Sequence, residues 1–349
     1  MGKTNDEILE LIQKNASANE ISKITGLSNK QLFHRLNMLK IKGYDFSRKY
    51  YSDGEIVYHL NKGFEKEKDI CLITKPKDNE LKLVLISDLH TSNEKERIDL
   101  LNEVYEFCVK NDINIIINAG DVIDGLLGSQ AKKYNTIEEQ IEYLIKTHPF
   151  DKNILNFVCL GNHDYDALEK TGQNLETSLF NRRHDIISIG YGTGIINIKN
   201  DKLVVRHPNT PITPKYKNID LNENTFIISG HSHHAKQIYC GNLLNYKLPS
   251  LSDLKTDNYS FPGFVKATIN FNLGIFDNVL IEQYIFLDKM YKVNESFNQL
   301  YGSKKTDVNA IKYEENRIPY KEEEIIEQPI VRTRKGTSQI DKFNKRYNG

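Results

Sequence analysis

The sequence has no excess of charge of either sign, since its 349 residues include 47 lysines and arginines and 47 aspartates and glutamates. Any attraction to an anionic or cationic partner must therefore come from local patches. It also lacks a run of about 18 apolar residues, which excludes a membrane-spanning helix. Its first residues lack the apolar core of a signal peptide. The four cysteines are scattered without CxxC spacing and outline no disulfide framework. We therefore expect a cytoplasmic protein with no membrane association.

The first sixty residues carry the start signals of a small helical unit. Three capping boxes precede apolar runs, at residues 4–7, 17–20 and 28–31. An Asp53-Gly54 turn then separates two strand-like runs between residues 50 and 58. Three short helices followed by a hairpin resemble a winged helix-turn-helix domain, which we place at residues 1–60.

The middle of the sequence alternates between strand and helix patterns. A charged stretch, residues 61–80, is predicted to be a linker. Beyond it we predict strands at 81–86, 113–117 and 156–160 and helices at 95–110 and 136–148. This alternation indicates an α/β domain, placed at residues 81–290. After residue 185 helices become scarce, as in the mixed half of a two-sheet sandwich. The highly charged residues 291–349 are expected to form a largely disordered extension.

Polar groups that can bind metal ions follow these three predicted strands and two further ones, at 203–205 and 226–229. They are Asp88-Leu89-His90, Gly120-Asp121-Val122-Ile123-Asp124, Gly161-Asn162-His163-Asp164, His207, and Gly230-His231-Ser232-His233. Sites in α/β sheets assemble at the carboxyl ends of the strands, so five such groups can converge on one point.

This ordered set resembles the calcineurin-like metallophosphoesterase superfamily over about residues 81–288, with its pattern D-x-H, G-D-x-x-D, G-N-H-D/E, H and G-H-x-H. The resemblance implies a two-sheet αββα sandwich that binds two divalent ions. One ion is assigned to Asp88, His90, Asp121 and His233. The other is assigned to Asp121, Asn162, His207 and His231, so that Asp121 bridges. Mixed imidazole and carboxylate ligands suit Mn, Fe, Zn or Co better than Ca, and the resemblance favours Mn.

The resemblance also implies a mechanism. Two ions about 3.5–4 Å apart hold a bridging hydroxide that attacks the phosphorus. His163 protonates the leaving group, and the Asp124 carboxylate orients its imidazole and favours the charged form. Gly125 takes the place of the arginine that protein Ser/Thr phosphatases of this superfamily use to capture phosphate, which argues against that activity.

The predicted winged helix-turn-helix suggests a polymer substrate. The second helix of such a pair enters the major groove of DNA, and here it is residues 29–41. From Glu20 to Tyr50 there are seven lysines and arginines against two acidic residues. The candidate DNA contacts are Lys30, Gln31, His34, Arg35, Arg48 and Lys49. The two halves together suggest a phosphodiesterase acting on nucleic acid, similar to a DNA nuclease.

Two alternatives stay open. One is a small-molecule phosphodiesterase or phosphatase in which the winged helix makes protein contacts. The other is a non-enzymatic scaffold that keeps the fold without the chemistry. The presence of His163 and Asp124 argues against the scaffold, because neither residue is needed merely to hold metal. The sequence leaves the metal, the oligomeric state and the substrate open.

Overall fold

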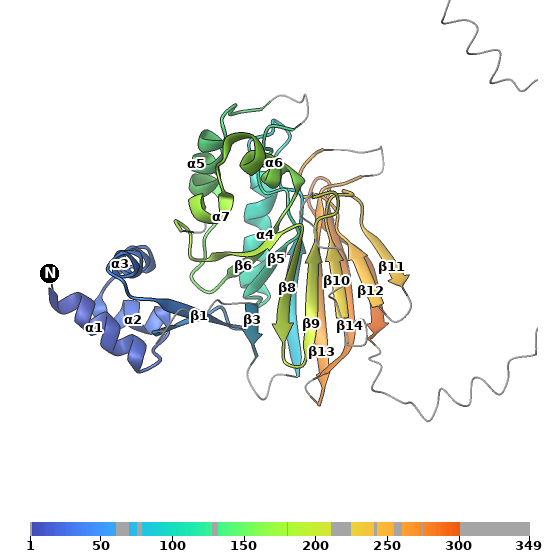
Figure 1. Cartoon of the computed structure of the whole chain (residues 1–349). Coiled ribbons are helices and arrows are strands. Elements are labelled where there is room, and N and C mark those ends of the chain that lie inside the picture. Colours follow the sequence, from blue (N-terminus) through green and yellow to red (C-terminus); the bar gives the residue numbers. More distant parts are fainter. Residues whose placement is uncertain are drawn as a thin grey trace, which may run out of the picture. The chain divides into compact units, whose positions relative to one another are not determined.

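A computed structural model describes residues 2–60, 70–74, 79–127, 132–179, 181–210, 225–240, 243–254, 260–273 and 275–300 (Figure 1). Its helices are α1 (Gly2–Gln13), α2 (Ala18–Thr25), α3 (Asn29–Ile41), α4 (Ile98–Lys110), α5 (Ile137–Thr147), α6 (Asn162–Thr171) and α7 (Leu175–Ser178). Within these ranges no helix is both long and apolar enough to cross a membrane.

The strands of the same ranges form two sheets. They are β1 (Phe46–Tyr51), β2 (Ile56–Leu60), β3 (Ile70–Ile73), β4 (Glu80–Ile86), β5 (Ile115–Asn118), β6 (Leu155–Leu160), β7 (Ile186–Tyr191), β8 (Thr193–Ile198), β9 (Asp201–Arg206), β10 (Thr225–Ser229), β11 (Lys236–Cys240), β12 (Leu243–Lys247), β13 (Gly263–Asn272), β14 (Ile275–Phe286) and β15 (Met290–Gln299). One sheet has the order β15-β14-β13-β4-β5-β6-β7, and the other has the order β11-β12-β10-β9-β8-β3-β1-β2.

Strand β4 is buried on both faces, as expected for a strand that pairs in parallel with β5. Leu83 and Leu85 belong to the core between the sheets, whereas Val84 and Ile86 belong to the core beneath the helices. Since successive side chains of a strand point to opposite faces, this sheet is the middle layer of the fold. The sequence prediction of a two-sheet α/β sandwich is therefore confirmed.

The second helical layer of the expected αββα sandwich is not found among the described residues. Side chains of α4, α5, α6 and α7 all pack in the same core, on the β4 face that carries Val84 and Ile86. Figure 1 shows these four helices gathered on one side. In β8 of the other sheet, buried and partly exposed positions alternate along the strand. This alternation is typical of a strand covered on one face only.

The N-terminal helices agree with two of the three predicted capping boxes. Ser17 and Ser28 cap α2 and α3, and in both boxes the third helical residue returns a hydrogen bond to the cap. The box at residues 4–7 is wrong as a helix start, because α1 already begins at Gly2. Between α1 and α2, Ser17 forms an isolated antiparallel bridge with Val57 of β2.

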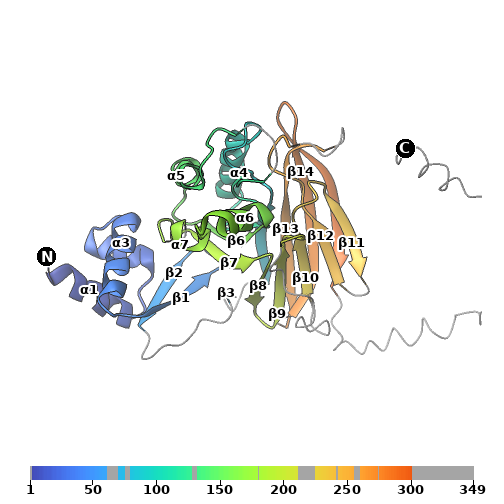
Figure 2. The ribbon, with the colours of Figure 1, turned by 45° about the horizontal axis from the view of Figure 1, so that its top comes forward.

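The hairpin of β1 and β2 does not stand apart from the larger sheet. Strand β1 pairs in parallel with β3, and β3 pairs with β8 (Figure 2). At the turn, the Ser52 amide donates to the carbonyl of Ile73 at 2.9 Å. The predicted linker, residues 61–80, therefore contains a strand that joins the hairpin to the sandwich. The residues between β2 and β3 lie outside the described part.

The sandwich also extends beyond the predicted boundary at residue 290. Strand β15 pairs antiparallel with β14 along its length, so residues 291–299 are strand and not part of a disordered extension. Most β15 side chains are exposed or partly exposed. A polar edge strand leaves only a weak hydrophobic pattern in the sequence, which explains the error. The prediction for residues 301–349 falls outside the described residues.

Candidate active site

The predicted metal-binding residues lie in loops at the carboxyl ends of five strands. Asp88 and His90 follow β4, Asp121 follows β5 and Asn162 follows β6. From the other sheet, His207 follows β9, and His231 and His233 follow β10. Parallel pairing aligns β4, β5 and β6, and likewise β9 and β10. Both sheets therefore present their loops at one end of the sandwich.

Five of these side chains sit on a left-handed backbone. The φ angles are 56° at Asp88, 45° at His90, 52° at Asp121, 72° at His231 and 57° at His233. Such angles are uncommon outside glycine and cluster at functional sites. Neighbouring loops hold them in place, since the Asp88 amide donates to Gly120 at 2.8 Å and the His90 amide to Asp121 at 3.0 Å.

Asp88, His90 and His233 form the first group that can hold an ion. Oδ1 of Asp88 lies 3.3 Å from Nε2 of His233 and 4.0 Å from Nε2 of His90. The other ring nitrogen of His233 lies 3.0 Å from the carbonyl oxygen of Leu254. A carbonyl accepts only from N–H, so this contact places the proton on Nδ1 and leaves Nε2 able to bind a metal ion.

Asp121, His207 and His231 form a second group. Nε2 of His207 lies 3.1 Å from Oδ2 of Asp121 and 3.0 Å from Oδ1 of Asn162. Nδ1 of His231 lies 3.0 Å from the same Asn162 oxygen. The Ala119 carbonyl, 2.6 Å from Nδ1 of His207, again leaves Nε2 facing the site. The structure thus brings together the ligand set that the family resemblance implies for the second ion.

Asp121 lies between the two groups. Its Oδ2 is 3.9 Å from Nε2 of His90 on one side and 3.1 Å from Nε2 of His207 on the other. Gly161 allows this position, because a Cβ there would collide with the Asp121 carboxylate. One buried carboxylate therefore faces ligands of both groups, as a bridging ligand must.

The electrostatics of the site favour the ionised carboxylate that a cation requires. Burial by itself would raise the pKa of Asp121, but the surrounding imidazoles, with His207 first among them, outweigh burial and hold this pKa far below its usual range. Burial would lower the pKa of His207, yet the adjacent Asp121 carboxylate raises it to about 10. The opposite charges of the Asp121 carboxylate and the His207 imidazole therefore stabilise each other at short range.

Two buried atoms support the fit to a metal ion. Oδ1 of Asp88 and Nε2 of His90 have no hydrogen-bond partner among the described residues. Buried polar atoms are normally satisfied, so an unsatisfied carboxylate oxygen beside an unsatisfied imidazole nitrogen calls for a ligand of another kind. Imidazole and carboxylate donors suit a first-row divalent ion. The residues present therefore fit divalent metal ions.

The contact between His163 and Asp124 differs from the predicted one. Nδ1 of His163 lies 2.7 Å from the backbone carbonyl of Asp124 and not from its carboxylate. The carboxylate lies 3.3 Å from Nδ1 of His90. His163 nevertheless reaches the site, since its ring lies 4.7 Å from that of His90 and its amide donates to Asp121. Asp124 therefore contacts the His90 imidazole through its carboxylate and His163 through its main chain.

Sequence reasoning missed three residues around this site. Lys132 forms an ion pair with the Asp124 carboxylate, and Asn93 donates to it at 3.0 Å. Neither stands in a recognisable motif, so only the fold reveals them. Buried Asp164 accepts from the amides of Val122 and Ile123 and so ties two site loops together. Its position in the Gly-Asn-His-Asp motif is the sequence signal that could have identified it.

Comparison with known protein families agrees with this geometry. Residues 81–235 match the model of the calcineurin-like phosphoesterase family. This region is a calcineurin-like phosphoesterase domain. The protein is a metal-dependent phosphoester hydrolase, and the grouped His and Asp side chains are where the domain can hold its divalent ions.

Solved structures similar to this phosphoesterase include vacuolar protein sorting 29 from Cryptosporidium parvum, at 15% identity and a TM-score of 0.38, covering 64% of this chain and 100% of that one. The phosphoesterase Yfce from E. coli, at 15% identity and a TM-score of 0.39, covers 63% and 100%. An archaeal phosphodiesterase, at 12% identity and a TM-score of 0.37, covers 59% and 100%. No curated protein matches the sequence.

The predicted DNA contacts lie on the N-terminal helices and hairpin, away from the metal-binding loops of the phosphoesterase domain. Lys30 and His34 on α3 line a groove between that helix and the phosphoesterase domain. The Gln31 side chain accepts from the amide of the cap residue Ser28, and Arg35 donates to Asn5 at 3.4 Å. Arg48 and Lys49 lie within β1, the strand between β2 and β3. These two residues therefore sit in a continuous sheet and not on a projecting wing.

Proposed function

We propose that this phosphoesterase is a phosphodiesterase that acts on nucleic acid with two divalent ions. Mn²⁺ is the favoured ion at both positions. The observation that carries the proposal of two ions is the position of Asp121, whose carboxylate faces both the His90 side and the His207 side. The assigned ligands are Asp88, His90, Asp121 and His233 for one ion and Asp121, Asn162, His207 and His231 for the other.

Different side chains have different roles in the proposed hydrolysis. When bound, a pair of divalent ions supplies an activated water and neutralises charge on the phosphoryl oxygens. His163 lies at the edge of the site, partly exposed, with Nδ1 against a carbonyl. That contact directs Nε2 away from the main chain, so a protonated His163 can deliver its proton from Nε2 to the leaving oxygen. The Asp124 carboxylate and Lys132 hold the His90 side of the site in place.

We also propose that residues 1–60 form a winged helix-turn-helix unit. The order of elements supports it: α1, the bridge of Ser17 with Val57, α2, α3 and the β1–β2 hairpin. In this unit α3 is the helix that would read a nucleic acid. The lysines and arginines of α3 and β1 support a phosphate-rich partner.

The test is turnover of full-length protein supplied with Mn²⁺. The substrates are bis-p-nitrophenyl phosphate, a cyclic nucleotide, single-stranded DNA and duplex DNA. Asp121→Asn should lose turnover on every substrate together with at least one bound ion, measured by elemental analysis. Hydrolysis of the generic diester without cleavage of either DNA would refute the nucleic-acid part of the proposal. Full turnover by Asp121→Asn would refute the bridging role.

One observation favours a second candidate, a small-molecule phosphodiesterase. The face of α3 that would enter a DNA groove is in contact with the phosphoesterase domain, because Nδ2 of Asn37 donates to the carbonyl of Asn181 at 3.1 Å. In this case the N-terminal unit makes protein contacts only. Cyclic-nucleotide turnover that far exceeds DNA turnover would select this candidate.

A further inference from the structure

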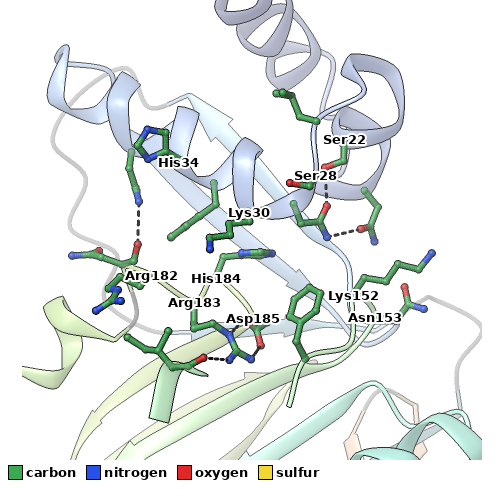
Figure 3. A pocket seen from close by; sticks show the side chains of 18 of the residues that line it. Ser22, Ser28, Lys30, His34, Lys152, Asn153, Arg182, Arg183, His184 and Asp185 are labelled. Atoms are coloured by element: carbon green, nitrogen blue, oxygen red, sulfur yellow. Dashed lines mark hydrogen bonds and ion pairs between the residues drawn. The ribbon is translucent and has the colours of Figure 1, made fainter. Parts of the chain in front are cut away.

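A groove of about 1190 Å³ separates the N-terminal helices from the phosphoesterase domain (Figure 3). One wall consists of α2 and α3. The other consists of the end of α5 with residues 150–153, and of residues 181–185, which precede β7. Pockets for small molecules usually measure about 300–1,000 Å³, so this groove has room for a longer ligand.

An aromatic surface lies across the groove. Phe33 of α3 lies 5.2 Å from the ring of His184, and Phe150 lies 6.1 Å from the same ring. Phe150 is 53% exposed, although it is a large apolar side chain. Burial lowers the pKa of His184, which favours the uncharged ring near pH 7. Because Phe33 and His184 are partly buried against each other, the exposed ring of Phe150 is the surface on which a planar ring can stack.

Cationic side chains surround this surface. Lys23, Lys30, Lys146 and Lys152 line the groove and have no ion-pair partner among the described residues. Lys30 extends from α3 towards the wall that carries His184 (Figure 3). Three acidic residues also line the groove. Asp185 pairs with Arg183, whereas Glu20 and Glu55 accept hydrogen bonds from Ser17 and Asn19, so the four lysines outnumber the two carboxylates that have no ion pair within the described ranges. The groove therefore presents positive charge to a ligand.

A DNA duplex does not fit this arrangement. A helix that reads the major groove must enter a channel about 12 Å wide between two phosphate backbones. Here the Asn37–Asn181 hydrogen bond and the contact of Phe33 with His184 tie α3 to the phosphoesterase domain. A single strand, whose bases are free to turn outwards and stack, needs no such clearance.

The groove lies at the opposite end of the strands from the metal-binding loops. His184 precedes β7 and Asn153 precedes β6, whereas Asn162 follows β6. Strand β6 has 6 residues, which separates the two ends by roughly 20 Å. A ligand in the groove is therefore held away from the bond to be cut, as a second contact with a polymer.

We propose that this groove binds single-stranded nucleic acid, with a base stacked on the exposed ring of Phe150 and phosphates held by Lys30 and Lys152. The proposal rests on the proposed action on nucleic acid and adds the strandedness and the place of binding. In this proposal the nucleic acid is recognised in a groove shared by both parts of the chain, and not on an exposed helix face.

The test measures binding of a short fluorescent oligodeoxythymidine to the full chain in a chelator, so that no cleavage occurs. Phe150→Ala should weaken binding by about tenfold or more, as expected for one lost base stack. Phe297→Ala is the matched control, since Phe297 is 64% exposed on β15.

A second experiment measures how binding depends on salt. Each phosphate contact in a single strand contributes roughly 0.7 to the slope of log affinity against log salt, so the double variant Lys30→Gln/Lys152→Gln should reduce this slope by about 1.4. Lys110→Gln/Lys289→Gln, at exposed lysines elsewhere, should leave that slope unchanged.

Three outcomes would overturn the groove proposal: equal binding by Phe150→Ala and Phe297→Ala, equal affinity for a duplex of the same length, or equal affinity for thymidine monophosphate. Cleavage with Mn²⁺ is assayed separately. Groove-dependent binding without cleavage of any nucleic acid would refute the proposed function and leave the groove as a binding site. Cleavage of DNA with no effect of the groove variants would refute the groove alone.

Discussion

The carboxylate of Asp124 lies 3.3 Å from Nδ1 of His90, on the ring edge opposite the nitrogen that faces Asp88 and Asp121. A carboxylate behind a metal-binding imidazole fixes the orientation of the ring and raises its basicity. The two aspartates of Gly-Asp-x-x-Asp therefore have different places in one loop: Asp121 lies in the site, and Asp124 lies behind His90.

Asp124→Asn should weaken metal binding by about 10–100-fold, the usual effect of removing such a supporting carboxylate. The measurement is calorimetric titration of the protein with Mn²⁺. Asp112→Asn, at an exposed position after α4, is the matched control. Unchanged metal affinity in Asp124→Asn would show that the contact with His90 is not functional.

His163→Ala should lower turnover by about 10²–10⁴-fold on diesters with a poorly acidic leaving alcohol, because no group then protonates the alkoxide. On a p-nitrophenyl ester, whose leaving group is stable as an anion, the loss should be much smaller. Parallel rates on both ester types check this, with metal content measured alongside. Equal losses on the two esters would contradict a role in proton donation.

The stability of the fold should depend on Gly54, which lies in the turn between β1 and β2. This residue has a φ of +82°, and a Cβ there would collide with the backbone carbonyl of Asn153. Gly43 has a φ of +93° with nothing near its missing Cβ. We expect Gly43→Ala to cost about 1–2 kcal/mol of unfolding free energy from backbone strain alone. Gly54→Ala should cost about 1–3 kcal/mol more from overpacking. Urea unfolding of both variants measures the difference, and similar losses would mean that the hairpin does not dock on the domain.

Buried His148 should make the fold sensitive to acid. Burial lowers its pKa to about 3, and its Nε2 lies 3.1 Å from the hydroxyl of Tyr105. A histidine in an unfolded chain has a pKa near 6.5. Between these values the unfolded state binds more protons, so stability is present in full above pH 6.5 and decreases as the pH falls towards 3.

At pH 5 this effect amounts to roughly 2 kcal/mol. His148→Gln should remove that part of the pH dependence, whereas His34→Gln, at an exposed position, should keep it. Chemical unfolding of the three proteins at pH 7 and pH 5 provides the measurement. The same pH dependence in His148→Gln and in the unsubstituted protein would refute this role.

The sequence alone predicted the chemistry of the site, because the ligands stand in short motifs directly after hydrophobic strands. Asp88, Asp121, Asn162 and His231 each follow a run that burial forces into a sheet, and the ends of parallel strands lie side by side. His207 lacked such a motif of its own, yet its strand β9 pairs with β10 and carries it to the same place. For these residues, the local sequence pattern and the pairing of strands were sufficient to predict that they meet.

Only the tertiary structure decided how the parts of the chain meet. Pairing of β1 with β3, the ring contact of Phe33 with His184 and the contact of Asp124 with His90 join residues that no spacing relates. The direction of a side chain and the docking of a polar strand depend on long-range packing, which leaves no periodic trace in the sequence. The same limit explains why β15 and β3 were missed: both are short or polar, and pairing with a neighbour stabilises them more than their own residues do.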